Sequence, residues 1–121
     1  MILADTSVWV DHFRRGSANF ARRLEQGEIA IHVVVLGELA TGNLARRQEA
    51  LAALHNLPRA KEGSTEECLA YLETHRLFGR GIGWNDIQLL VAARLGHMHL
   101  WSLDRSLTNI AARFHLLHQE T

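Results

Sequence analysis

Four acidic residues of this 121-residue chain lie inside or at the end of apolar runs, where a lone carboxylate is costly to keep ionised. They are Asp5, Glu38, Asp86 and Asp104. Such a charge leaves water only if it is paired, hydrogen-bonded or bound to a metal ion, and the bases near these residues in the sequence are too scattered to serve them all. A shared divalent cation is the simplest arrangement that would hold them.

The chemistry of such a site follows from its ligands. Carboxylates that lie together raise one another's pKa unless a cation neutralises them. Mg²⁺ and Mn²⁺ favour oxygen ligands, and a metal of this kind lowers the pKa of a bound water and stabilises the charge that builds on a phosphate. We therefore expect Mg²⁺- or Mn²⁺-dependent hydrolysis of a phosphodiester bond.

Two hydroxyl residues stand beside these acids in the sequence. Thr6 follows Asp5, and Ser102 comes two residues before Asp104. Each hydroxyl is placed to hydrogen-bond the neighbouring carboxylate and to fix its orientation, as the outer residues of a metal site do. A helix cap and an ordinary strand position explain the two residues equally well.

Apolar runs of strand length alternate along the chain with amphipathic stretches of helix length. We predict strands at residues 2–5, 28–32 and 98–103, and shorter extended pieces at 59–62 and 115–118. Between them we predict seven helices. The first carries Val8, Trp9 and Phe13, the second runs from Ser17 to Gly27, and the fifth begins at Ser64. The third, fourth, sixth and seventh are predicted at 33–41, at 44–57, from Asn85 to Gly96 and at 105–114. The end signals are Ser17 and Asn85 as N-caps, Ser64 with Glu67 as a capping box, and Gly42 as a stop. The β-branched start of 33–41 would also suit a longer second strand.

Strands that alternate with helices indicate a parallel sheet covered on both faces. Ligands of such sheets gather beyond the carboxyl ends of the strands. Asp5 and Asp104 each follow a predicted strand. Asp86 starts a helix that should run back over the sheet, and Glu38 lies on the helix that leaves the second strand. We therefore expect the four acids to meet at one edge of the sheet.

Length and composition indicate a single domain spanning residues 1–121. Hydrophobic residues make up 47%, and the longest apolar stretch falls far short of a membrane span. The N-terminus lacks the basic region and the cleavage site of a secretory signal, so we do not expect export. The single Cys68 cannot form an internal disulfide, and we interpret it as a small core residue, which suits the reducing cytoplasm.

The charges are balanced, with 13 basic and 13 acidic residues, which argues against the general electrostatic attraction of a histone-like binder. All but one of the basic residues are Arg, and three pairs occur: Arg14 with Arg15, Arg22 with Arg23, and Arg46 with Arg47. Arg suits bidentate contacts with phosphate. A solvated helix face explains such pairs as well, and the sequence leaves both interpretations open.

Four segments that contain the acids resemble, in order and spacing, the motifs of one protein family. They are residues 5–11 (DTSVWVD), 37–42 (GELATG), 86–94 (DIQLLVAAR) and 100–107 (LWSLDRSL). Together they are similar to the PIN-domain ribonucleases, specifically the VapC-type toxins of bacterial toxin–antitoxin pairs, over nearly the whole chain. The fourth segment departs from the family pattern, with Ser102 where Thr is usual and with Ser106 and Leu107 where an acidic and an aromatic residue are common.

The resemblance implies a three-layer α/β/α sandwich with a central, mainly parallel sheet of four to five strands. It also implies that Asp5, Glu38, Asp86 and Asp104 bind Mg²⁺ or Mn²⁺ and activate the water that cleaves RNA, with transfer RNA and ribosomal RNA as the suggested target classes. The implied protein partners are a small antitoxin, whose C-terminal arm lies in a groove, and a second copy of the chain in a homodimer.

Apolar residues at helical spacing are candidates for the antitoxin groove: Trp9, Phe13, Phe20 and Leu51. Burial in the core is the more ordinary explanation for residues at this spacing. Trp84, beside a glycine loop and close to Asp86, is a candidate for stacking on an RNA base, with packing as the alternative.

Eight histidines raise the alternative of a zinc site, with His97 and His99 on one side of a strand. No cysteine partner or helical histidine pair completes a known ligand pattern, so surface and edge positions explain them better. His12 and His32 lie near the acidic motifs, but nothing in the sequence makes them ligands.

Three other functions match part of the pattern. A phosphorelay receiver domain groups carboxylates at a sheet edge, but it needs a lysine near its last strands, and the chain has only Lys61. A haloacid-dehalogenase-type phosphatase carries Asp-x-Asp after its first strand, whereas Asp5 is followed by Thr6 and Ser7. A non-catalytic scaffold of the same fold would have no need of all four acids.

Overall fold

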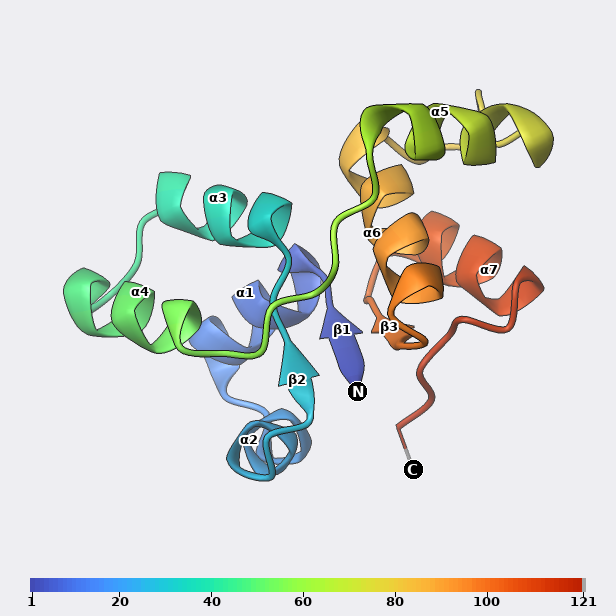
Figure 1. The fold of residues 1–121 in the computed structure, drawn as a ribbon. Coiled ribbons are helices and arrows are strands. Elements are labelled where there is room, and N and C mark those ends of the chain that lie inside the picture. Colours follow the sequence, from blue (N-terminus) through green and yellow to red (C-terminus); the bar gives the residue numbers. More distant parts are fainter. Residues whose placement is uncertain (121) are drawn as a thin grey trace.

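A computed structural model describes residues 1–120 of the chain. Within them, an open sheet has the strand order β2–β1–β3, formed by β1 (Ile2–Ala4), β2 (Ile29–Ala30) and β3 (His99–Trp101) (Figure 1). Both neighbours run parallel to β1, and Leu3 lies opposite Ala30 on one side and Leu100 on the other. The parallel sheet predicted from the alternation of strands and helices is confirmed.

Each edge of the sheet is extended by a single bridge and not by a full strand. The bridges join Ile31 to Arg59 and Leu100 to Leu117, both in parallel orientation. Pro58 at the first edge has no N–H to donate, and His115 at the second has a φ of 59°, which interrupts an extended chain. The family resemblance implies four to five strands. Among the described residues, the sheet has three strands, and one bridge extends it at each edge.

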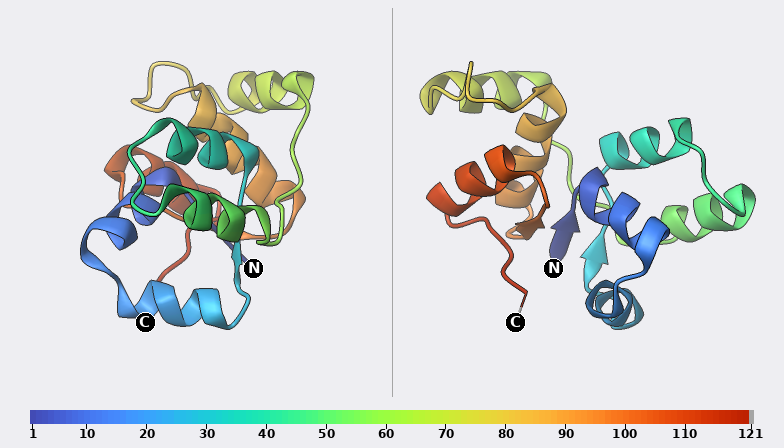
Figure 2. Two further views of the ribbon diagram at one scale, coloured as in Figure 1. Left: turned by 90° about the vertical axis from the view of Figure 1, so that its left-hand side faces the viewer. Right: turned by 180° about the vertical axis from the view of Figure 1, so that it is seen from behind.

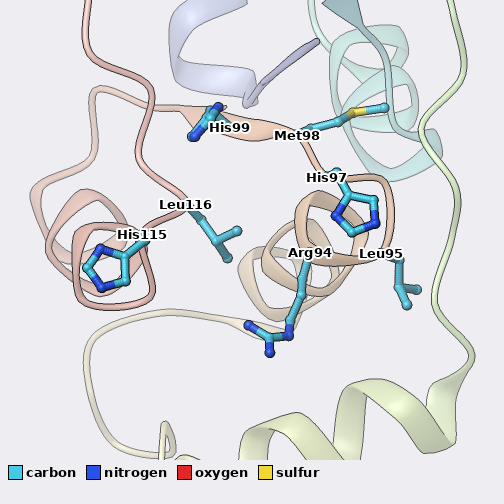
Figure 3. A pocket seen from close by; sticks show the side chains of 7 residues that line it. All are labelled: Arg94, Leu95, His97, Met98, His99, His115 and Leu116. Carbon is cyan, nitrogen blue, oxygen red and sulfur yellow. The ribbon is translucent and has the colours of Figure 1, made fainter.

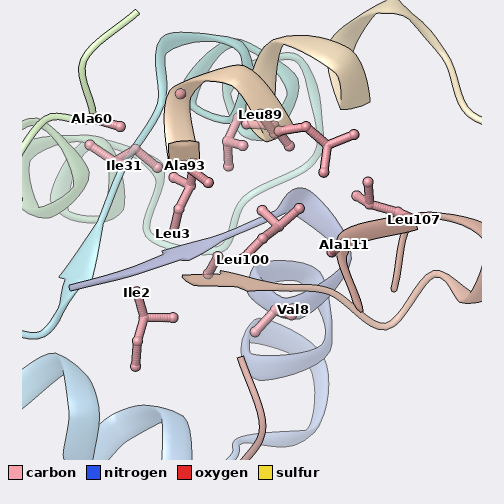
Figure 4. Packing of buried hydrophobic residues seen from close by; sticks show 14 of the residues in the cluster. Ile2, Leu3, Val8, Ile31, Ala60, Leu89, Ala93, Leu100, Leu107 and Ala111 are labelled. Carbon is pink, nitrogen blue, oxygen red and sulfur yellow. The ribbon is translucent and has the colours of Figure 1, made fainter. Parts of the chain in front are cut away.

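The helices surround this sheet. They are α1 (Thr6–Arg15), α2 (Ala18–Glu25), α3 (Val33–Thr41), α4 (Arg47–His55), α5 (Thr65–Thr74), α6 (Trp84–Leu95) and α7 (Arg105–Arg113). Figures 1 and 2 show α1 to α4 gathered beside β2, and α5 to α7 beside β3. In Figure 4, α6 lies over one face of β1 and β3 while α1 lies over the opposite face. This is the three-layer arrangement that the family resemblance implies.

Local signals determine where most of these helices begin. Ser17 caps α2, and Ser64 forms the predicted capping box with Glu67 at the start of α5, with hydrogen bonds of 2.9 and 3.0 Å. The prediction of a helix at 33–41 matches α3. The helix predicted at 44–57 begins later, because Arg46 precedes α4 in a left-handed conformation with a φ of 49°.

The predicted N-cap of α6 is wrong. The helix begins at Trp84 and its N-cap is Gly83, so Asn85 already lies within the first turn. The reason is the competing carboxylate of Asp86, whose Oδ2 accepts the Gly83 N–H at 3.0 Å and satisfies one of the free donors that precede the helix. Asp86 is thus both a capping residue and a candidate site residue.

The core lies mainly between the sheet and α6, as the nearly continuous apolar sequence of this helix predicts. Its buried residues are Ile87, Leu89, Leu90, Val91, Ala92 and Ala93. They meet Leu3 and Leu100, which are fully buried on adjacent strands (Figure 4). Cys68 is 1% exposed, which confirms its assignment to the core. None of the described helices combines the length and the apolar character that crossing a bilayer requires.

Candidate active site

Asp5 follows β1 directly and caps the N-terminus of α1. It is only 6% exposed. Its carboxylate accepts hydrogen bonds from the Ser7 hydroxyl at 2.5 Å and the Val8 N–H at 3.2 Å on Oδ1, and from the Ser102 hydroxyl at 2.5 Å on Oδ2. Because both oxygens have donors, this buried carboxylate is held in one orientation.

Glu38 approaches the same edge from α3. Its side chain is exposed, and its Oε1 accepts a hydrogen bond of 2.8 Å from the hydroxyl of Thr6. Helices α1 and α3 pack against each other, so the first turn of α1 reaches the acidic residue of α3. The contact spans 32 positions of the chain, and it links Glu38 to the residue that follows Asp5.

Asp86 and Asp104 both stand at helix N-termini. Asp86 is half-buried in the first turn of α6, and Asp104 is the exposed N-cap of α7, where its Oδ2 accepts the Leu107 N–H at 3.0 Å. The unpaired N–H groups and the dipole of a helix stabilise negative charge at this end. Asp5 has the same place on α1, so three helix N-termini direct their positive ends toward the acidic residues.

The hydroxyls predicted to orient these carboxylates are present, but their partners differ from the prediction. Thr6 donates to Glu38 and not to the adjacent Asp5, and Ser102 donates to Asp5 and not to the carboxylate of Asp104. Ser102 instead accepts the N–H of Asp104 at 2.9 Å. Ser102 reaches Asp5 because β1 and β3 end side by side, and Thr6 reaches Glu38 because α1 packs against α3.

Ser7 is a site residue that the sequence interpretation misses. Its hydroxyl donates to Asp5 and accepts the N–H of Leu103 at 2.9 Å, so it joins the end of β1 to the loop that follows β3. The sequence feature that indicates this role is its position two residues after Asp5. A short hydroxyl side chain at this position can hydrogen-bond back to an acidic N-cap.

The carboxyl of Asp86 lies within electrostatic range of the other three acids. Burial raises the pKa of this carboxyl above its ordinary value of 3.8, the Gly83 N–H lowers it, and the charges of Asp104, Asp5 and Glu38 each raise it further. Coulombic effects of this kind require proximity. The fold therefore brings together the four acids that the sequence scatters over its whole length.

Their chemistry suits a hard divalent cation. Within residues 1–120, no three His, Cys, Asp or Glu side chains form a ready ligand group. Each of the four carboxylates is hydrogen-bonded to a hydroxyl or N–H. The donor set nevertheless consists only of oxygen atoms, which Mg²⁺ and Mn²⁺ prefer. Burial is the main cause of the raised pKa of Asp86, and the charges of the other three acids add a repulsion that such a cation would relieve.

The histidines do not form a zinc site in the described part of the chain. His97 and His99 line a surface cavity of about 630 Å³ with Arg94 and His115, and in Figure 3 their rings are separate and point in different directions. His32 is buried and caps α3, with its Nδ1 accepting the Val34 N–H at 3.0 Å. His12 accepts the Ser17 N–H at 3.2 Å.

A small apolar cavity of about 150 Å³ lies where α1, α2 and α4 meet. It is lined by Trp9, His12, Phe13, Leu24, Ala50, Ala53, Leu54 and Leu57. Two of the predicted groove residues, Trp9 and Phe13, take part, and the Nε1 of Trp9 is buried without a hydrogen-bond partner in the described residues. Phe20 does not take part, because it is fully buried between Trp9 and Trp101, and Leu51 is half-buried outside the lining.

Trp84 is 42% exposed at the first position of α6, two residues before Asp86. Less than half of its surface is therefore open to solvent. This exposure leaves both the stacking and the packing interpretations in place.

Comparison with known proteins agrees with this architecture. The family model described as PIN domain matches residues 2–113. Ribonuclease VapC32 of Mycobacterium tuberculosis, found in strains CDC 1551 / Oshkosh and ATCC 25618 / H37Rv, is 38% identical over 108 residues, which are 88% of this chain and 87% of that protein.

Two solved structures share the fold. A toxin–antitoxin complex from Klebsiella pneumoniae has a TM-score of 0.65 at 20% identity, covering 86% of this chain and 87% of that chain. The PAE2754 protein from Pyrobaculum aerophilum has a TM-score of 0.56 at 16% identity, covering 94% and 88%. Because the family model matches residues 2–113 and the identity to Ribonuclease VapC32 is 38%, the chain belongs to the PIN-domain family and is a relative of the VapC ribonucleases.

Proposed function

We propose that the chain is a metal-dependent endoribonuclease whose site consists of Asp5, Glu38, Asp86 and Asp104. The observation that carries the proposal is the meeting of these acids at one edge of the sheet. The Ser102 hydroxyl joins Asp5 to the N–H of Asp104, and Thr6 is hydrogen-bonded to Glu38. The charges of these three acids also help to raise the pKa of Asp86, after burial. The name of the relative that is 38% identical, a ribonuclease, supports RNA as the substrate. An all-oxygen donor set supports Mg²⁺ or Mn²⁺ as the ion.

The four acids would hold the ion, which when bound supplies a water of lowered pKa and stabilises charge on the phosphate. The protein contributes a fixed frame for them. Ser7 and Ser102 hold both oxygens of Asp5, and Thr6 holds one oxygen of Glu38. Asp86 is fixed at the start of α6, where its Oδ2 accepts the Gly83 N–H at 3.0 Å.

The protein would act as the toxin of a toxin–antitoxin pair. One structural neighbour is a toxin–antitoxin complex, which supports an antitoxin as the partner. The cavity between α1, α2 and α4 suits an apolar segment of that partner, and the buried Nε1 of Trp9 would donate to one of its carbonyl groups. Phe13, 44% exposed, offers a further apolar contact at the rim.

We further propose a homodimer that acts in the cytoplasm on transfer RNA or ribosomal RNA. These assignments rest on the family, since target choice depends on RNA shape and on splayed bases. The exposed Trp84 beside Asp86 is a candidate for stacking on one such base.

The test is cleavage of total cellular RNA by the purified chain, with and without Mn²⁺, compared with Asp5→Asn. We expect metal-dependent cleavage by the parent and none by the variant, because the substitution removes the charge and one of the two acceptor oxygens while the side chain keeps its size. Circular dichroism and the melting temperature check that the variant is folded. Equal cleavage by both proteins, or no cleavage by either at high concentration, would contradict the proposed catalytic site. The chain would then be interpreted as a non-catalytic scaffold.

A further inference from the structure

The three arginine pairs whose role the sequence leaves open differ in their surroundings. Arg15 pairs with Asp11, Arg22 and Arg23 both reach Glu120, Arg46 lies 3.9 Å from Glu49, and Arg47 donates to the carbonyls of Ala40 and Gly42. Arg14 is exposed, and within residues 1–120 it has no acidic or carbonyl partner. Among the described residues, five of these six guanidinium groups therefore lie within reach of an acid or a carbonyl group, and Arg14 does not.

Arg14 lies between two cavities that reach the acidic edge from opposite sides of α1. One, of about 520 Å³, is lined by Ser7, Val10, Asp11, Arg14, Arg15 and Leu103. The other, of about 230 Å³, is lined by Val10, Phe13, Arg14, Glu38, Leu39, Gly42, Asn43 and Leu44. The first contains Ser7, which holds Asp5, and the second contains Glu38 itself. Both hollows therefore join the acidic site to the Arg14 side chain.

The spacing of residues along α1 also links Arg14 to the acidic site. Thr6, Val10 and Arg14 are spaced four residues apart and lie on one face of α1, and Thr6 is hydrogen-bonded to Glu38. With a rise of 1.5 Å per residue, Arg14 stands about 12 Å along the axis from Thr6. Arg14 is therefore about two turns from the residue that contacts Glu38, and it lines the same cavity as Glu38.

We propose that Arg14 is a positioning residue that binds a backbone phosphate of the RNA next to the one that is cleaved. The proposal rests on the ribonuclease function proposed above. Acidic side chains repel an RNA strand over much of this edge, so a free guanidinium on the approach supplies the attraction that holds the strand in line. The planar fork of Arg suits two phosphate oxygens at once.

Asp11, which lines the first cavity, does not neutralise Arg14, because its Oδ1 is engaged by Arg15. The exposure of Arg14 also means that its replacement should leave the fold intact. A loss of RNA binding after substitution would therefore report a direct contact.

The experiment measures binding of a fluorescent oligouridine of about 12 nucleotides, in EDTA so that no cleavage occurs, at several salt concentrations. Arg14→Gln should bind about three- to tenfold more weakly than the parent. The slope of log affinity against log salt should fall by about 0.7, as expected for one lost phosphate contact to a single strand. Arg14→Lys should keep the slope. Arg22→Gln is the matched control, since Arg23 still holds Glu120 in its absence.

In cleavage assays with Mn²⁺, Arg14→Gln should raise KM and change kcat little. Unchanged oligouridine binding by Arg14→Gln would overturn the inference and would leave Arg14 to a protein partner. Equal losses in Arg14→Gln and Arg22→Gln would overturn it too, as a general effect of charge. If the parent still cleaves RNA in either case, the proposed function stands and only the role of Arg14 fails.

Discussion

Ser102 and Asp5 are joined by a hydrogen bond of 2.5 Å although 97 positions separate them in the chain. The Ser102 hydroxyl donates to Asp5 Oδ2 and accepts the N–H of Asp104 at 2.9 Å. Because β1 and β3 are adjacent parallel strands, their carboxyl ends lie side by side, and one hydroxyl serves the loops that follow both. Ser102 thus couples the orientation of Asp5 to the start of α7.

Replacement of Ser102 by Ala should weaken both the fold and the site. It leaves one oxygen of a buried carboxylate without its donor, which should lower the free energy of unfolding by about 1 to 3 kcal/mol. Cleavage should fall by about tenfold or more, as for other residues that orient a metal ligand. Chemical denaturation and RNA cleavage measure the two effects. Ser102→Thr keeps the hydroxyl and should retain most activity, and an Ala variant as active as the parent would contradict this role.

Asp86→Asn should abolish cleavage and stabilise the folded protein at about pH 7. The pKa of Asp86 is raised by burial and by the neighbouring acids, so the folded protein binds its proton more tightly than the unfolded chain does. Ionisation of Asp86 above its unfolded pKa therefore opposes folding, and the amide removes this cost while still accepting the Gly83 N–H. The gain in melting temperature should vanish near pH 4 or below. A variant less stable than the parent at neutral pH would contradict this account.

Mn²⁺ should raise the melting temperature of the parent protein in the absence of RNA. A ligand that binds only the folded state stabilises it in proportion to the logarithm of its concentration, and here it would also relieve the repulsion around Asp86. Asp5→Asn and Asp104→Asn should each reduce the shift, whereas Glu49→Gln on α4 should not. Equal shifts in all four proteins would mean that Mn²⁺ binds somewhere else.

Stability should depend on His32 between about pH 7 and pH 5. Burial lowers the pKa of His32 below its ordinary value of 6.5, and the charge of Arg59 lowers it further while that of Glu62 raises it. The unfolded chain then takes up the proton at a higher pH than the folded one, so this stabilisation is complete above about pH 6.5 and is lost as the pH falls. Protonation would also remove the acceptor that caps α3.

The measurement is the free energy of unfolding against pH for the parent and for His32→Asn. Asn can cap a helix but does not titrate, so the variant should lose part of the pH dependence, whatever its absolute stability. His97→Asn is the control, because His97 is exposed and has a left-handed φ of 53° that Asn tolerates. A parent and His32→Asn variant with parallel pH profiles would show that His32 contributes nothing.

The sequence alone determined the elements and the identity of the acids. Apolar periodicity and capping residues such as Ser17 and Ser64 are short-range signals, and they located the helices because a helix satisfies its own backbone within a few residues. The placement of Asp5 and Asp104 after apolar runs predicted one shared edge, since parallel strands end together. The prediction of a helix start failed at Asn85, where the carboxylate of Asp86 competes for the same N-terminus, and before α4, where Arg46 has a left-handed φ.

The tertiary structure alone decided which side chains meet. The partners of Thr6 and Ser102, the burial of Phe20 and the free guanidinium of Arg14 all depend on residues tens of positions away. The sequence around a hydroxyl residue or an arginine does not indicate its partner, because the partner depends on how strand ends and helices pack. The sequence therefore specified which groups are available for catalysis, and packing assigned each of them its neighbour.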